Sequence, residues 1–155
     1  MTNEVMGLLN LHDVFLNASI QRKAMHAAPI VEEADNFHFS DRGRFERAWA
    51  AFLYVLIESW RSYPMASVRE YIASRVDLTN LNAVLDEGDQ SGHIAKLRDV
   101  RHYMCHRDRR EYWDDGRLGV LLQLEYNEKL HMAFSKVLLE VMKSVKSSPA
   151  AGVSA

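Results

Sequence analysis

The chain has 155 residues, of which 48% are hydrophobic and 26% are charged, the profile of one globular domain able to build its own core. Its formal net charge of −2 excludes nucleic-acid binding driven by overall charge, and its single cysteine excludes an internal disulfide. No apolar run approaches the ~20 residues of a membrane span. Because residues 1–4 also lack the basic start of a signal peptide, we expect a cytosolic protein.

The first third of the chain predicts two long helices. Residues 4–27 carry apolar side chains at intervals of three and four, the spacing of one helical face, and Pro29 with the polar residues 32–36 marks a connection. Asp41 is the expected N-cap of a second helix that continues to Trp60. Its apolar face holds Phe45, Trp49, Phe52, Leu53, Leu56 and Trp60. Such regular spacing favours a core role over a ligand-binding aromatic box.

The rest of the chain predicts shorter helices followed by one long one. Pro64 suits the first turn of a short third helix, and another short helical piece covers residues 78–85. Two glycines predict a loop over residues 86–92, in which Ser91 caps a helix over residues 93–106. A charged loop over 107–119 precedes a last helix over 120–145. We therefore expect an all-α, compact bundle of four to five helices over residues 1–146, with residues 147–155 as a disordered tail.

A basic patch lies between residues 93 and 110, where six basic side chains face two acidic ones. The basic residues are Lys96, Arg98, Arg101, Arg107, Arg109 and Arg110, against Asp99 and Asp108. A local patch of this kind attracts phosphate groups. A solvated helix end gives the same composition, because basic side chains near a helix C-terminus suit the macrodipole. Charge alone favours neither interpretation.

Arg101, His102 and His106 are the residues whose types point most clearly to a chemistry. Arginine fits phosphate oxygens with a planar fork, and histidine exchanges a proton near neutral pH. RNA cleavage without a metal needs a base, an acid and a cation for the phosphorane, roles that histidine and arginine fill. In an ideal helix Arg101 and His106 lie ~140° apart. They converge only if the helix ends or loosens near His106, or if a second copy of the chain shares the groove.

These residues resemble the signature of the HEPN superfamily, which is arginine, then Asn, Asp or His, then a few variable residues and histidine, late in a helical bundle. HEPN domains are all-α and usually dimeric, and many are metal-independent endoribonucleases of toxin–antitoxin, phage-defence and RNA-processing systems. The resemblance implies that Arg101 and His106 are catalytic and that His102 supports them. It also implies RNA and a second copy of the chain as partners, with Arg98, Arg107, Arg109 and Arg110 holding the RNA backbone.

Several other interpretations remain open. Arg101 could be structural, paired with Asp99, Asp108 or Glu111, and the chain could be a non-catalytic partner of a toxin, antitoxin or nucleotidyltransferase. A metal site is a weaker alternative. His102 and His106 have the spacing to grip a metal with Asp99, whereas the one Glu-x-x-His match, Glu128 with His131, has no second such pair. We expect Cys105 to serve packing, and Tyr112 and Trp113 to anchor the loop rather than stack on bases. We expect no cofactor and no metal.

Overall fold

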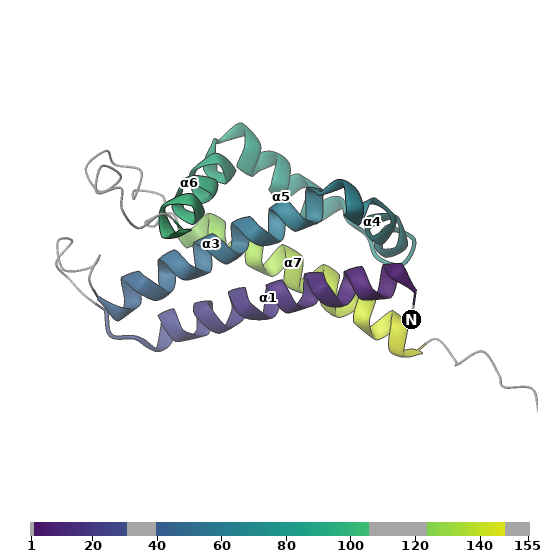
Figure 1. Cartoon of the computed structure of the whole chain (residues 1–155), viewed down its shortest axis with the longest axis horizontal. Helices are drawn as coiled ribbons and strands as arrows, with labels where there is room; N and C mark the ends of the chain where they lie inside the picture. Colours follow the sequence, from purple (N-terminus) through teal and green to yellow (C-terminus); the bar gives the residue numbers. More distant parts are fainter. Residues whose placement is uncertain (1, 31–39, 106–123, 148–155) are drawn as a thin grey trace, which may run out of the picture.

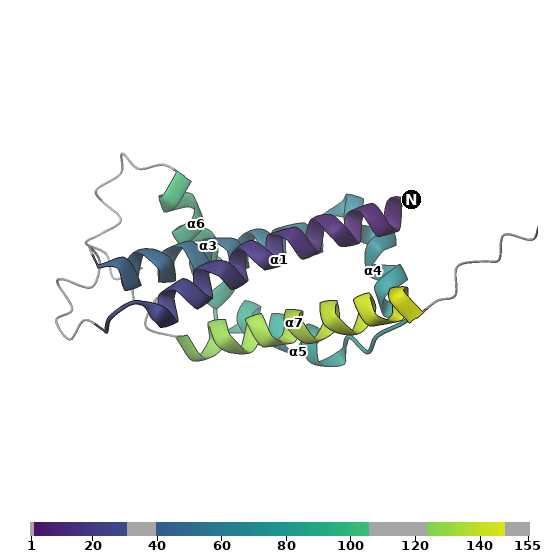
Figure 2. The ribbon, with the colours of Figure 1, turned by 90° about the horizontal axis from the view of Figure 1, so that it is seen from below.

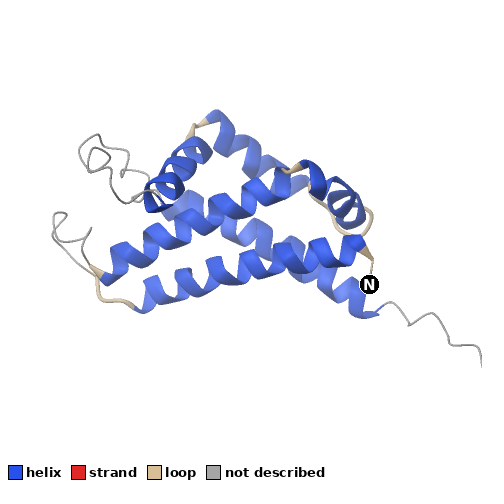
Figure 3. Cartoon of the chain, viewed as in Figure 1, coloured by secondary structure: helices blue, strands red, loops and turns tan. Residues whose placement is uncertain are grey.

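The computed structural model describes residues 2–30, 40–105 and 124–147, and within these ranges it contains helices and no strand (Figure 3). The helices are α1 (Asn3–Ala27), α3 (Asp41–Arg61), α4 (Ala66–Ala73), α5 (Thr79–Gln90), α6 (His93–Cys105) and α7 (Leu124–Ser147), with a 3-10 turn, η1 (Tyr63–Met65), before α4. The predicted all-α helical bundle is confirmed.

The helices form two layers. α1 and α3 run antiparallel in one layer, and α5 and α7 form the other (Figures 1 and 2). The short α4 lies at one end of the bundle and α6, which packs on α3, lies at the other (Figure 1). None of the helices in the described ranges is long and apolar enough to cross a lipid bilayer. The arrangement carries the end of α6, and with it Arg101, on the outer side of α3.

The core is centred on α3. Trp49, Leu53 and Leu56 are fully buried, and the indole of Trp60 packs edge-on against the Phe134 ring of α7 with 6.0 Å between ring centroids. This confirms the predicted core role of the aromatic stripe. Its remaining members, Phe45 and Phe52, are half-buried and pack against the edge of the core.

Local caps set the ends of α1 and α3. The Ser40 hydroxyl, and not the predicted Asp41, caps α3 by accepting from the Gly43 amide at 3.1 Å. Asp41 is the first helical residue, where a carboxylate suits the positive end of the helix, and it pairs with Arg44. The next residue, Arg42, donates from its guanidinium to the Met25 carbonyl at 3.2 Å and to the Ala28 carbonyl at 3.3 Å, both at the end of α1.

The predicted loop over residues 86–92 is wrong for its first five residues, because α5 continues to Gln90. Gly88 lies within this part of α5, and close packing explains why the position holds a glycine. A Cβ on Gly88 would lie 1.9 Å from the Tyr126 hydroxyl oxygen of α7. That hydroxyl donates to the Val84 carbonyl of α5 at 2.8 Å. The turn begins only at Ser91, whose hydroxyl accepts from the His93 amide at 3.4 Å, and Gly92 takes a left-handed φ of 75°.

Two further boundaries differ from the sequence prediction. Pro64 lies in the turn η1 and not in the following helix α4, which begins at Ala66. At the C-terminal end, α7 continues to Ser147, two residues past its predicted end and one past the predicted domain boundary. The predictions for His106, the loop 107–119, residues 120–123 and the tail from residue 148 lie outside the described residues.

We predict that Gly88→Ala lowers the free energy of unfolding by about 1–3 kcal/mol, because the added methyl group forces Tyr126 away from α5. Urea unfolding followed by circular dichroism measures the loss. Gln90→Ala, at an exposed position of the same helix, is the control and should stay near wild type. A Gly88→Ala variant as stable as that control would contradict the close packing of α5 on α7.

Candidate functional site

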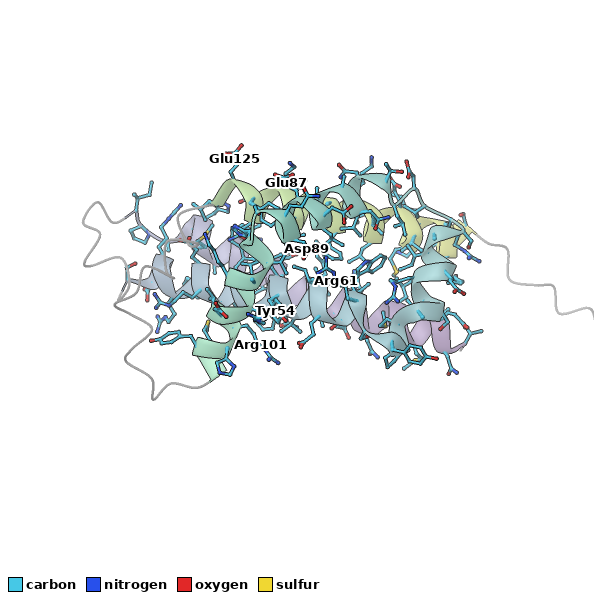
Figure 4. The ribbon with its side chains drawn as sticks, turned by 90° about the horizontal axis from the view of Figure 1, so that it is seen from above. Tyr54, Arg61, Glu87, Asp89, Arg101 and Glu125 are labelled. Carbon is cyan, nitrogen blue, oxygen red and sulfur yellow. The ribbon has the colours of Figure 1, made fainter. Side chains whose placement is uncertain are left out.

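Arg101 and His102 lie in the last described turn of α6. The Arg101 side chain (labelled in Figure 4) is 40% exposed. Its Nη2 lies 3.8 Å from Glu58 Oε2 of α3, and His102 is exposed. His106, Arg107, Arg109 and Arg110 lie outside the described residues. Their convergence with Arg101 and their contacts to RNA therefore stay predictions.

The sequence did not indicate the partner of Arg101. Glu58 lies 43 residues earlier, on another helix, whereas Asp99, one of the expected partners, is within 3.6 Å of Arg98. A pair of half-exposed side chains at 3.8 Å contributes about 0–1 kcal/mol to stability. The guanidinium of Arg101 is therefore held loosely enough to exchange Glu58 for an anionic ligand.

A groove of about 480 Å³ opens beside this pair, between α3, α6 and the end of α5. Ile57, Ile94 and Ala95 supply apolar surface, and Tyr54 and Arg98 also line the groove. The charged members of its lining are Glu58, Arg61, Asp89 and Arg98. Arg101 contacts Glu58, so the groove adjoins the motif.

Arg61 of α3 and Asp89 of α5 form a two-pronged ion pair in this groove (Figure 4). Arg61 Nη1 donates to Asp89 Oδ1 at 3.1 Å and Nη2 donates to Oδ2 at 2.6 Å. The hydrogen bonds to Asp89 raise the pKa of Arg61 above its usual value.

A larger hollow of about 640 Å³ lies on the other side of Arg61, toward Arg69 and Glu70. The smaller groove is the better candidate because its lining includes Glu58, the partner of Arg101, whereas the lining of the larger hollow does not.

Glu46 is an ionisable side chain buried beneath the surface of α3. It is 1% exposed, and no atom of the described residues hydrogen-bonds its Oε1. Burial raises the pKa of Glu46 to about 7, against the opposing charges of Arg42 and Arg47. Glu46 is therefore largely neutral at mildly acid pH.

Its neighbour Arg47 links the core to the end of α6. Arg47 is 9% exposed and interacts electrostatically with Tyr103, the residue after His102. Burial lowers the pKa of Arg47, and the charges of Tyr103 and Glu46 act in the opposite direction. Sequence reasoning missed Glu46 and Arg47. The available signal was their register, since Glu46 lies three and seven residues before the core residues Trp49 and Leu53.

His131 of α7 is a neutral core histidine. Trp49 Nε1 donates to His131 Nδ1 at 3.3 Å, so Nδ1 carries no proton and Nε2 holds the proton facing the Ser19 hydroxyl at 3.5 Å. Burial lowers the pKa of His131 to about 4, with the charge of Arg22 acting in the same direction. The hydrogen bonds and the pKa agree, because protonating Nδ1 would remove the acceptor for Trp49.

The Glu128 and His131 side chains of the one Glu-x-x-His match have other partners. Glu128 accepts from Arg22 at 2.7 Å and lies 2.8 Å from His26 Nε2. Burial acts to raise the pKa of Glu128, but the hydrogen bonds from Arg22 and His26 outweigh burial and lower it. Within residues 2–30, 40–105 and 124–147, no three His, Cys, Asp or Glu side chains cluster so that they could hold a metal ion.

Comparison of the chain with protein-family models, with curated proteins and with solved structures gives no match.

We predict opposite pH dependences for variants at the two buried ionisable residues. The folded chain binds a proton on Glu46 more tightly than the unfolded chain does. Protonation of Glu46 therefore stabilises the fold fully below pH 4.5, and this stabilisation is lost as the pH rises to about 7. The neutral form of His131 stabilises the fold fully above pH 6.5, and this stabilisation is lost as the pH falls to about 4. Relative to wild type, Glu46→Gln should gain stability as the pH rises through its range, and His131→Gln should gain as the pH falls, each by roughly 3 kcal/mol.

Urea unfolding across this pH range measures both differences. Curves for the two variants that run parallel to the wild-type curve would contradict the burial of these charges.

Proposed function

We propose that this chain is a HEPN-like, metal-independent endoribonuclease, cytosolic and acting as a homodimer in toxin–antitoxin, phage-defence or stress systems. The observation that carries the proposal is the placement of Arg101. Its guanidinium lies at the outer end of α6 in an all-α bundle, 40% exposed and loosely paired with Glu58. A ligand phosphate can therefore replace Glu58 at low cost.

The roles follow from the chemistry of each side chain. Arg101 stabilises the charge of the phosphorane, and His106 acts as base on the 2′-hydroxyl or as acid on the leaving 5′-oxygen. His102, which is exposed on the same turn as Arg101, orients the site or binds phosphate. Arg98, with a 60% exposed side chain, holds the RNA backbone together with Arg107, Arg109 and Arg110.

A second copy of the chain supplies the remaining proton transfer. One histidine cannot act as both base and acid within a single step, so two His106 side chains, one from each protomer, divide these roles across a shared groove. The exposed end of α6 supports this arrangement, because the Arg101 side chain is 40% exposed and His102 is exposed.

A second candidate function is a non-catalytic interaction module. Five large apolar side chains are exposed on α1 and α7: Met6 at 43%, Leu16 at 43%, Ile20 at 60%, Met132 at 57% and Leu139 at 56%. Exposed apolar surface of this kind favours a protein partner. The pairing of Arg101 with Glu58 is also what a structural arginine would show.

The test is RNA cleavage in excess chelator, measured together with the free energy of unfolding. We expect wild type to cleave, and Arg101→Ala and His106→Ala to lose cleavage. Arg101→Ala should keep its stability within about 0.5 kcal/mol, because its ion pair is exposed. Lys143→Ala, which removes a positive charge from the far end of α7, is the matched control and should cleave like wild type.

Loss of cleavage that accompanies a large loss of stability would instead assign Arg101 a structural role. Absence of cleavage by wild type would favour the interaction module, and cleavage that the chelator stops would revive the metal site.

A further inference from the structure

The groove beside Arg101 has the size and lining of a site for one small aromatic ligand. Its volume of about 480 Å³ falls within the range of ligand pockets, roughly 300–1,000 Å³. Ile57 and Ile94 line the groove and are only 1% and 5% exposed, so the more accessible lining comes from Ala95 and the aromatic residue Tyr54. Such surfaces receive a flat ring and exclude water from it.

The charge of the groove is balanced. Arg61 and Asp89 neutralise each other through two hydrogen bonds, and the other two charged lining residues are Glu58 and Arg98. A neutral interior does not attract phosphate, so an RNA backbone gains nothing by entering the groove. Arg101 adds a positive charge at the side of the motif, within 3.8 Å of Glu58.

The ligand that fits is therefore a neutral, flat group with hydrogen-bonding edges, attached to an anion. We propose that the groove binds one nucleobase of the RNA, next to the phosphate held by Arg101. This inference rests on the proposed function for its biological setting, but the binding site itself can be tested without cleavage.

The Arg61–Asp89 pair supplies the polar contacts that a base requires. The Asp89 carboxylate keeps lone pairs beyond those used by Arg61 and accepts from amino or imino groups, while Arg61 donates to ring nitrogens or carbonyl oxygens. The two residues come from α3 and α5, and the apolar lining comes from α3 and α6, so a base in the groove contacts three helices. Any of the four bases can stack on Tyr54, whereas the Arg61–Asp89 pair can distinguish the bases by the hydrogen-bonding groups on their edges.

The test uses a variant whose new side chain fills the groove and leaves the core residues unchanged. Ala95 is exposed on α6 and lines the groove, so Ala95→Trp places an indole where the base would lie. Ala83→Trp makes the same change at an exposed position of α5 outside the groove lining and is the matched control. The four nucleoside 3′-monophosphates are titrated one by one into the full-length chain, and binding is followed by amide chemical shifts in NMR spectra.

We expect at least one nucleotide to bind wild type and Ala83→Trp equally. Ala95→Trp should weaken that binding more than about tenfold, which corresponds to about 1.4 kcal/mol. Tyr54→Leu is a second variant that keeps the groove open and should weaken the same nucleotide by removing the stacking face. No binding of any nucleotide to wild type, or equal binding by Ala95→Trp and Ala83→Trp, would overturn the proposal.

Cleavage by the same proteins separates this inference from the proposed function. If wild type cleaves RNA but binds no nucleotide in the groove, the nuclease stands and the base site fails. If nucleotide binding depends on Ala95 and Tyr54 but no RNA is cleaved, the base site stands and the nuclease fails.

Discussion

The packing of α3 against helices on several sides is the constraint on which the rest of the structure depends. α3 contacts α1, α6 and α7, and Trp49, Leu53 and Leu56 have no exposed surface. Deleting large side chains from such a position costs both buried area and a cavity. Because α6 rests on the outer side of α3, the same packing fixes the position of Arg101 and its contact with Glu58. The Arg101 end of the candidate site is therefore positioned by the core packing of α3.

Polar groups in this core are stabilised by remaining neutral or by having specific partners. His131 accepts from Trp49, which lies in the aromatic stripe of α3, and this bond needs the neutral imidazole. Glu46 has an unpartnered oxygen among the described residues and responds by holding a proton more tightly. Burying either charge without a partner would cost more than neutralising it. Since the two residues titrate in opposite directions, their effects on stability offset each other at mildly acid pH.

Local periodicity predicted the order and core faces of the helices, because apolar spacing and caps are local signals. The predicted number of four to five was too low, since the described residues form six α-helices, two of them short. Local periodicity gave the wrong secondary structure where a residue distant in the sequence determines the packing. Gly88 has the chemistry of a loop residue, but it lies within α5, where the absence of a side chain lets Tyr126 of α7 pack against it. The same limit applies to the site. The motif could be read from consecutive residues, whereas Glu58 as the partner of Arg101 and the groove lined by three helices arise only from tertiary packing.

In the proposed mechanism Arg101 binds the phosphate and the 2′-hydroxyl is the attacking group, with no metal. The most direct measurement compares an RNA with the same RNA carrying a single 2′-deoxy nucleotide at the cleaved position, both in excess chelator. We expect cleavage of the all-RNA substrate only, with a 2′,3′-cyclic phosphate on the upstream product. Cleavage of the deoxy substrate at that position, or a 3′-hydroxyl on the product, would contradict the mechanism.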